Sequence, residues 1–109
     1  MPEQDKKKEL HLIEFYGREC PFCVRMDPLI ARLEKETGLK IKKFEVWHNE
    51  GNQRKMNDYA HIFADACGGQ LGVPVFYNSK TGDALCGAVD YDIFKDWAQK
   101  KNTQPSYVT

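Results

Sequence analysis

The strongest constraint in this sequence is a pair of apolar segments on either side of one long helical pattern. Residues 10–16 read L-H-L-I-E-F-Y, which is typical of a buried strand with Glu14 as its polar exception. A helix is expected over Pro21–Thr37, because proline suits a first helical turn and Gly38 suits a helix end. Residues 40–47 read as a second strand. This strand–helix–strand unit predicts two parallel strands joined by a crossover helix.

The second half of the chain continues with a turn at residues 49–52 and one further helix. Its apolar face has helical spacing and ends at two glycines; the face comprises Met56, Tyr59, Ala60, Phe63, Ala66 and Cys67. A strand at residues 73–77, a polar turn at 78–83 and a returning strand at 84–87 indicate an antiparallel pair. Asp90 is a suitable N-cap for a last helix.

Together these segments predict an α/β fold with a central four-stranded mixed sheet flanked by helices, in the order β-α-β-α-β-β-α. The 109 residues suit a single domain, with a core at about residues 10–100 and polar tails at both ends. Sixteen basic and sixteen acidic residues cancel, so composition gives no reason to expect nucleic acid or membrane as a partner. The first ten residues hold no apolar signal core. We expect a cytoplasmic monomer, although an organelle or a processed exported form would fit the same residues.

The chemistry of the chain is concentrated in Cys20-Pro21-Phe22-Cys23. Cys20 falls at a helix N-terminus, where free N–H groups and the helix dipole stabilise a thiolate, so it is the expected nucleophile. Cys23, one turn further on, would resolve the mixed disulfide by attacking Cys20. The same spacing also fits half of a zinc site or a small structural disulfide. No second ligand pair is evident in the sequence, so we expect no metal.

The context of this motif resembles the thioredoxin superfamily from about Leu10 to Lys100. The motif follows a strand, and Pro28 stands eight residues after Cys20, where thioredoxins carry a helix-kinking proline. Gly72-Val73-Pro74 is similar to the family segment that ends in a cis-proline. Gly87 and Asp90, ahead of an amphipathic helix, resemble the family's C-terminal end. The resemblance implies a thioredoxin-like fold and a thiol–disulfide oxidoreductase that acts in cell redox homeostasis.

The resemblance also implies roles for individual residues. Pro74 would be cis and would place the backbone of Val73 beside Cys20, where a substrate strand can pair with it. Glu14 stands where thioredoxins carry a buried acid, and it would accept the proton of Cys23 during resolution; a partly exposed or lysine-paired acid is the alternative. Pro21 and Phe22 set the turn between the cysteines, and Phe22 would touch the partner.

The subfamily is a separate question, because C-P-F-C is similar to the motif of glutaredoxins. Of the positions with which glutaredoxins bind glutathione, only Gly87 and Asp90 match here, whereas Gly17 and Gly72 replace the basic residue and the threonine. We therefore expect no resident cofactor. Glutathione stays a candidate co-substrate beside disulfide-containing proteins, and a reductase would be the electron donor.

Two further cysteines have less defined roles. Cys67 lies on the apolar face of its helix and is expected to be a buried, inert thiol; Cys86 is expected to be a packed structural cysteine, with a third redox thiol as the alternative. Trp47 is expected to pack rather than to contact substrate. The second functional hypothesis is a non-enzymatic module that binds a metal or an iron–sulfur cluster through Cys20, or a redox-sensing adaptor.

Overall fold

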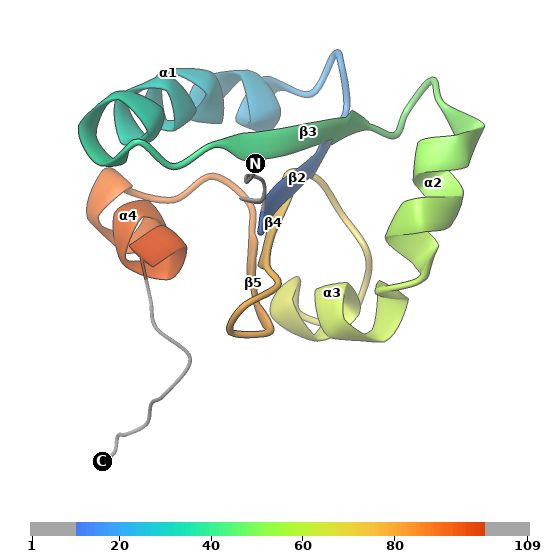
Figure 1. Cartoon of the computed structure of the whole chain (residues 1–109). Coiled ribbons are helices and arrows are strands. Elements are labelled where there is room, and N and C mark those ends of the chain that lie inside the picture. Colours follow the sequence, from blue (N-terminus) through green and yellow to red (C-terminus); the bar gives the residue numbers. More distant parts are fainter. Residues whose placement is uncertain (1–10, 100–109) are drawn as a thin grey trace, which may run out of the picture.

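The structure, a computed structural model, describes residues 11–99, which form a four-stranded sheet flanked by four helices (Figure 1). In chain order the elements are β2 (Leu12–Tyr16), α1 (Pro21–Thr37), β3 (Ile41–Glu45), α2 (Glu50–Asn57), α3 (Ala60–Ala66), β4 (Val75–Asn78), β5 (Asp83–Cys86) and α4 (Tyr91–Gln99). The predicted fold class, a mixed sheet with flanking helices, is confirmed. The predicted polar tails lie outside the described residues.

The sheet has the strand order β3-β2-β4-β5. β2 and β3 run parallel, and β4 is antiparallel to both β2 and β5, as the sequence predicted for the first and last pairs. Phe15, near the end of β2, lies opposite Val75, the first residue of β4. The segment that follows β2 and the segment that precedes β4 therefore meet at the same end of these two central strands. These two segments contain the Cys20 motif and Val73-Pro74, respectively.

Each face of the sheet carries its own hydrophobic core. α1 and α4 cover one face and α2 and α3 cover the other, as Figure 1 shows. The core beneath α1 and α4 includes Leu12, Met26, Ile30, Leu33, Phe76, Phe94 and Trp97. The core beneath α2 and α3 consists of Phe15, Val46, Met56, Phe63 and Val75. Because side chains alternate along a strand, neighbouring residues of β2 and β4 serve opposite cores.

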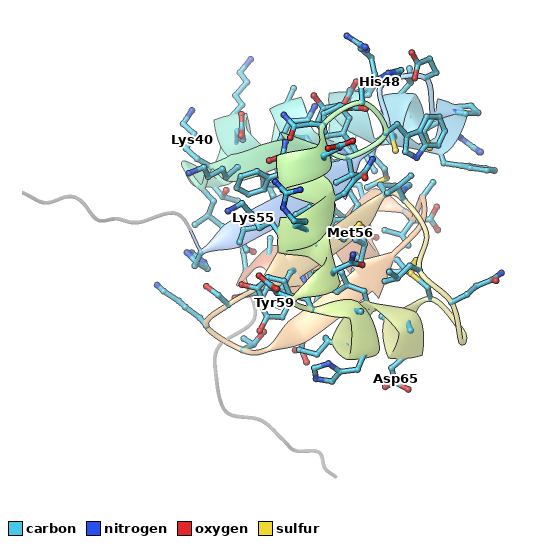
Figure 2. All side chains as sticks on the ribbon, turned by 90° about the vertical axis from the view of Figure 1, so that its right-hand side faces the viewer. Lys40, His48, Lys55, Met56, Tyr59 and Asp65 are labelled. Atoms are coloured by element: carbon cyan, nitrogen blue, oxygen red, sulfur yellow. A yellow bond between two sulfur atoms is a disulfide. The ribbon has the colours of Figure 1, made fainter. Side chains whose placement is uncertain are left out.

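The one helix expected after residue 52 is in fact two helices, so the predicted element order was one helix short. α2 begins early because the Asn49 side chain caps it, accepting the backbone N–H of Asn52 at 2.9 Å. It ends at Asn57-Asp58, two poor helix formers, and the chain turns at Tyr59 before α3 (Figure 2). The break lets both Met56 and Phe63 reach the sheet, where they are buried.

α1 has the predicted bounds, and its ends have the predicted chemistry. Cys20 is its N-cap, and Gly38 adopts φ 77° and donates its N–H to the Glu34 carbonyl at 3.0 Å. Pro28 lies inside the helix. The third strand begins two residues later than predicted, at Val75, since Pro74 has no N–H to give to a ladder.

The prediction of two unpaired, packed thiols at Cys67 and Cys86 was wrong, because these cysteines form a disulfide. Cys67 ends α3 and Cys86 ends β5, and the packing of α3 on β5 brings their Cα atoms to 5.2 Å. Sequence separation does not reveal this contact, which depends on where α3 lies. Cys20 and Cys23 are free thiols.

Within residues 11–99, no helix has the length and hydropathy required to cross a membrane.

The buried side chain of Asn78 ties β4 to α4, and its loss should destabilise the fold. Its amide donates to the Trp97 carbonyl at 3.1 Å, and its oxygen accepts the N–H of Lys80 at 3.0 Å. We predict that Asn78→Ala lowers the free energy of unfolding by about 1–3 kcal/mol, because a buried carbonyl loses its donor. Urea denaturation measures this. Ser79→Ala, at an exposed neighbour, is the control and should change stability by less than about 0.5 kcal/mol; equal effects of the two variants would contradict the prediction.

Candidate active site

The site is built around Cys20, which caps α1 with its own sulfur. Its backbone is extended (φ −76°, ψ 117°), and its Sγ accepts the backbone N–H of Cys23 at 3.3 Å. The Cys20 N–H in turn donates to the Gly17 carbonyl at 3.0 Å, which fixes the turn after β2. Pro21 occupies the start of the helix, and the first turn contains no acidic residue. The Cys20 sulfur therefore accepts one backbone N–H and lies at the positive end of the helix dipole.

Cys23 lies one helical turn after Cys20 in α1 and has a different electrostatic environment. Burial, followed by its interaction with the Cys20 side chain, raises the pKa of the Cys23 thiol to about 12. Both cysteines are almost fully buried, each 3% exposed. At neutral pH Cys23 is a thiol, so it needs a proton acceptor before it can act as a nucleophile.

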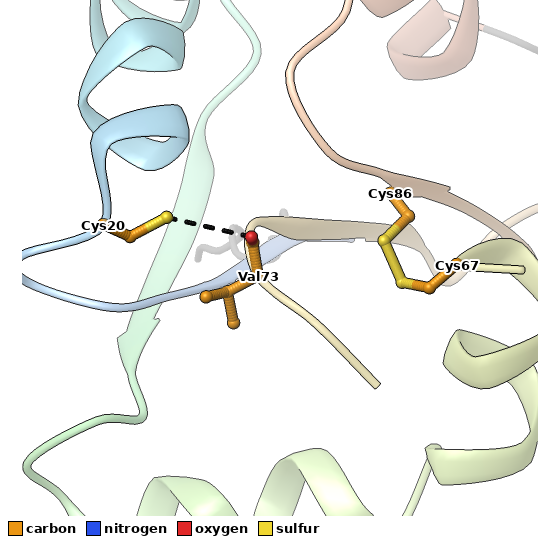
Figure 3. The surroundings of a disulfide bond; sticks show 4 residues. All are labelled: Cys20, Cys67, Val73 and Cys86. Atoms are coloured by element: carbon orange, nitrogen blue, oxygen red, sulfur yellow. Dashed lines mark hydrogen bonds between the residues drawn. A yellow bond between two sulfur atoms is a disulfide. The ribbon is translucent and has the colours of Figure 1, made fainter. Parts of the chain in front are cut away.

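Val73 and Pro74 face the motif from the segment just before β4. The Val73–Pro74 peptide bond is cis, and the Val73 carbonyl lies 3.8 Å from Cys20 Sγ, within reach of the S–H donor. Figure 3 shows this contact as a dashed line from Cys20 to Val73. Gly87, the residue after β5, donates its N–H to the Pro74 carbonyl at 2.8 Å and so also holds this segment.

Glu14 is a fully buried acid in the middle of β2. Neither of its carboxylate oxygens has a hydrogen-bond partner among residues 11–99, and the nearest cation, Lys43 Nζ, is 3.9 Å from Oε1. Burial raises the pKa of Glu14 to about 7, against the opposing effect of Lys43 and with a contribution from Asp27. The Glu14 charge is also the smallest of the causes that raise the pKa of Cys23. With a pKa of about 7, Glu14 exchanges a proton near neutral pH.

The Glu45 carboxylate accepts hydrogen bonds from two turns near Cys20, the turn before α1 and the turn after β3. Glu45, the last residue of β3, accepts backbone N–H groups from Arg18 (2.9 Å), Trp47 (3.1 Å) and His48 (2.9 Å). Its partial burial works to raise its pKa, but these donors outweigh that effect and hold the pKa below its usual value. His48 Nε2 also lies 2.7 Å from Glu19, the residue before Cys20. The turn after β3 is thereby fixed against the turn before α1.

This arrangement places Trp47 directly over Gly17. A Cβ atom at residue 17 would lie 2.3 Å from the indole ring, so only glycine allows the ring to pack there. Trp47 nevertheless stays 46% exposed. The prediction that Trp47 packs is therefore accurate for one side of the ring, while the other side is available to a partner.

An apolar groove of about 490 Å³ opens at the Cys20 sulfur. Its lining contains no charged side chain and consists of Cys20, Pro21, Phe22, Val46, Trp47, Met56, Leu71, Gly72 and Val73. Three of these are large apolar side chains that are well exposed: Phe22 (52%), Trp47 (46%) and Leu71 (39%). An apolar surface of this kind beside a reactive group is typical of a binding site.

The structure thus brings together most of the residues singled out from the sequence. Pro21, Phe22 and Val73 line the groove, and Pro74 and Gly87 support it. Asp90 does not line it; with Ala88 and Val89 it borders a separate cavity against α1. The sequence interpretation did not identify the wall formed by Val46, Trp47, Met56, Leu71 and Gly72 as part of the site. Trp47, a large aromatic residue next to a polar turn, was the one sequence feature that could have indicated this wall of the site.

Within the part of the chain that the structure describes, no group of three or more His, Cys, Asp or Glu side chains is arranged to hold a metal ion. The residues that converge here are two thiols, one buried carboxyl group and a backbone edge. They are suited to proton transfer and thiol–disulfide exchange.

Comparison with solved structures identifies the fold. A mutant thioredoxin from Halobacterium salinarum NRC-1 superposes with a TM-score of 0.54 and 23% identity, covering 87% of this chain and 76% of that one. Thioredoxin from Aeropyrum pernix superposes with a TM-score of 0.56 and 21% identity, covering 82% and 72%, respectively. By sequence, no protein-family model and no curated protein matches the chain. The chain therefore has the thioredoxin fold.

The buried acid should make stability depend on pH. Because the pKa of Glu14 is raised from 4.5 to about 7 in the folded state, the folded protein binds the proton more tightly than the unfolded chain does. Stability should therefore fall as pH rises from about 4.5 to about 7 and stay low above that, by about 3 kcal/mol in total. Glu14→Gln should remove this component of the pH dependence, as measured by urea denaturation at several pH values.

A matched control is Asp92→Asn, at an exposed acid of α4. It should keep the pH dependence of the wild type. If Glu14→Gln also kept it between pH 4.5 and 7, the raised pKa of Glu14 would be refuted.

Proposed function

We propose that this chain is a thiol–disulfide oxidoreductase in which Cys20 and Cys23 cycle between a dithiol and a disulfide. The observation that carries the proposal is the contrast between the two sulfurs of one helical turn. The Cys20 sulfur accepts the N–H of Cys23 at the end of the helix dipole, whereas the pKa of Cys23 is raised to about 12. Cys20 is thus favoured as the attacking group, and Cys23 stays protonated until it resolves the mixed disulfide.

In the first step, the Cys20 thiolate attacks one sulfur of a substrate disulfide. A bond forms between Cys20 Sγ and that sulfur, the substrate S–S bond breaks, and one substrate thiolate leaves. The contact between Cys20 Sγ and the Val73 carbonyl, 3.8 Å apart, supports a docking edge at this point. A substrate strand lying along Val73 would bring its disulfide to the sulfur.

In the second step, the Cys23 proton passes to Glu14 and the Cys23 thiolate attacks Cys20 Sγ. The mixed disulfide breaks, the second substrate thiolate leaves, and the Cys20–Cys23 disulfide forms. The substrate gains two electrons and the protein loses two. A dithiol reductant or glutathione then restores the protein. The pKa of Glu14, about 7, makes it a better acceptor near neutral pH than an ordinary exposed carboxylate.

The groove favours disulfides that are flanked by apolar side chains of a polypeptide. Its lining is apolar and contains Trp47, Phe22 and Leu71, which are exposed in the free protein and would be covered by a partner. Glutathione presents carboxylates, for which this lining offers no cation. We therefore infer that protein or peptide disulfides are preferred over glutathione disulfide as substrates.

The two cysteines should respond differently to substitution. Cys20→Ser should reduce the rate of insulin disulfide reduction to that of the uncatalysed control, because the attacking sulfur is lost and Cys23, which is buried and protonated, cannot replace it. Cys23→Ser should instead accumulate a mixed disulfide at Cys20, detected by mass spectrometry after acid quenching, because the resolving thiol is missing. An active Cys20→Ser variant, with turnover unchanged, would overturn the proposed function.

Trp47 should contribute to substrate affinity through its exposed face. Trp47→Ala is expected to raise KM about tenfold, equivalent to ~1.4 kcal/mol, for a peptide disulfide with phenylalanine or leucine beside its cysteine. Trp47→Phe is the conservative control and should stay close to the wild type. A small charged substrate, dithiodipropionate, should show no change in KM with either variant. Equal changes for both substrates would contradict an apolar docking role.

A further inference from the structure

Residues 68–74, here called the docking loop, join α3 to β4 and form one wall of the groove. The loop contributes Leu71, Gly72 and Val73 to the lining. Within residues 11–99, its backbone hydrogen bonds to other backbone groups occur only near its two ends. Gly68 and Gly69 donate to the last turn of α3, and the Pro74 carbonyl accepts from Gly87. Between these points the loop has no regular structure.

The Cys67–Cys86 disulfide closes the base of this loop. Cys67 is the residue immediately before the loop, and Cys86 is the cross-strand neighbour of Val75, the residue immediately after it. The disulfide and the β4–β5 pairing therefore join the beginning of the loop to its end. Figure 3 shows Val73 between Cys20 and the disulfide, so the loop spans from the clamped base to the reacting sulfur.

The composition of the loop explains why a covalent clamp would matter here. Three of its seven residues are glycines, Gly68, Gly69 and Gly72, and glycine loses more conformational freedom on ordering than any other residue. Without the disulfide, the beginning of the loop is held by α3 alone, a helix of 7 residues. The end of the loop would remain fixed, because β4 pairs with both β2 and β5.

The disulfide lies at the margin of the core beneath α2 and α3, against which Cys67 and Cys86 pack as partly buried side chains. α3 is anchored by Phe63, which is fully buried and whose ring lies 5.6 Å from that of Phe15 and 5.4 Å from that of Tyr59. Cys67, one of the two cysteines of the disulfide, follows the last turn of this helix at the beginning of the docking loop. Removal of the disulfide should therefore free the loop more than it disturbs the core.

We propose that Cys67 and Cys86 are positioning residues for substrate binding: their disulfide holds the beginning of the docking loop, so that Leu71 and Gly72 stay in the wall of the groove beside Cys20. The disulfide takes no part in electron transfer and stays intact during turnover. This inference rests on the proposed function, because it concerns substrate docking at the same groove. A clamped loop lets a substrate bind without ordering Leu71 and Gly72 at that moment.

The test compares the wild type with the double variant Cys67→Ala/Cys86→Ala, which leaves no odd thiol. If the freed loop is competent for about a tenth of the time, KM for an apolar peptide disulfide should rise roughly tenfold while kcat changes less than about twofold. KM for dithiodipropionate, which does not need the loop, should stay unchanged. Hydrogen exchange at Gly68 and Gly69, whose N–H groups donate to α3, should be faster by a similar factor, about tenfold, in the double variant.

The control is Phe94→Leu, at a buried residue of α4 on the opposite face of the sheet. It should lower overall stability without changing either KM or loop exchange. Unchanged KM and unchanged exchange in the double variant, or free thiols at residues 67 and 86 in the purified oxidised protein, would refute the inference. The exchange measurement needs no turnover, so it tests the clamp even if Cys20→Ser disproves the proposed function.

Discussion

A single hydrogen bond, from the backbone N–H of Cys23 to the sulfur of Cys20, connects the fold of this chain to its chemistry. A helix must satisfy the first N–H groups that have no partner within it, and most helices use an oxygen for this purpose. Here a sulfur is the cap, so the group that begins α1 is also the group that the proposed function assigns as the nucleophile. The position of this cap is fixed by β2, which ends at Tyr16, and by the Gly17 carbonyl that accepts the Cys20 N–H.

The site has a cost to stability that the rest of the fold must offset. Glu14 is buried with no hydrogen-bond partner among residues 11–99, although an uncompensated buried acid disfavours the folded state when it is ionised. The same burial brings its pKa to about 7, so this carboxyl group exchanges a proton near neutral pH. Two aromatic cores, one on each face of the sheet, supply the packing that tolerates this acid. A stability-optimised chain would carry an apolar residue at this position, so its presence points to chemistry.

Local patterns in the sequence predicted what depends on local physics. Pro21 and Gly38 gave the bounds of α1, and the apolar strands predicted the parallel and antiparallel pairs of the sheet. The break between α2 and α3 was not predictable from periodicity, because the apolar spacing runs through Tyr59 while the sheet surface requires a turn there. The Cys67–Cys86 disulfide and the Trp47 wall depend on how distant segments pack, and spacing in the sequence does not encode that. Trp47 lies over Gly17 where Glu45 and the contact of His48 with Glu19 hold the two turns together.

The central claim is that Cys20 and Cys23 form a reversible dithiol–disulfide pair that is independent of Cys67–Cys86. The most direct measurement equilibrates the protein in glutathione buffers of graded ratio, blocks free thiols by acid quenching and alkylation, and maps each cysteine by mass spectrometry. We predict one two-electron transition at Cys20–Cys23, with a midpoint between about −270 and −120 mV, while Cys67–Cys86 stays oxidised through that transition. If no buffer ratio yields a Cys20–Cys23 disulfide, the account is contradicted.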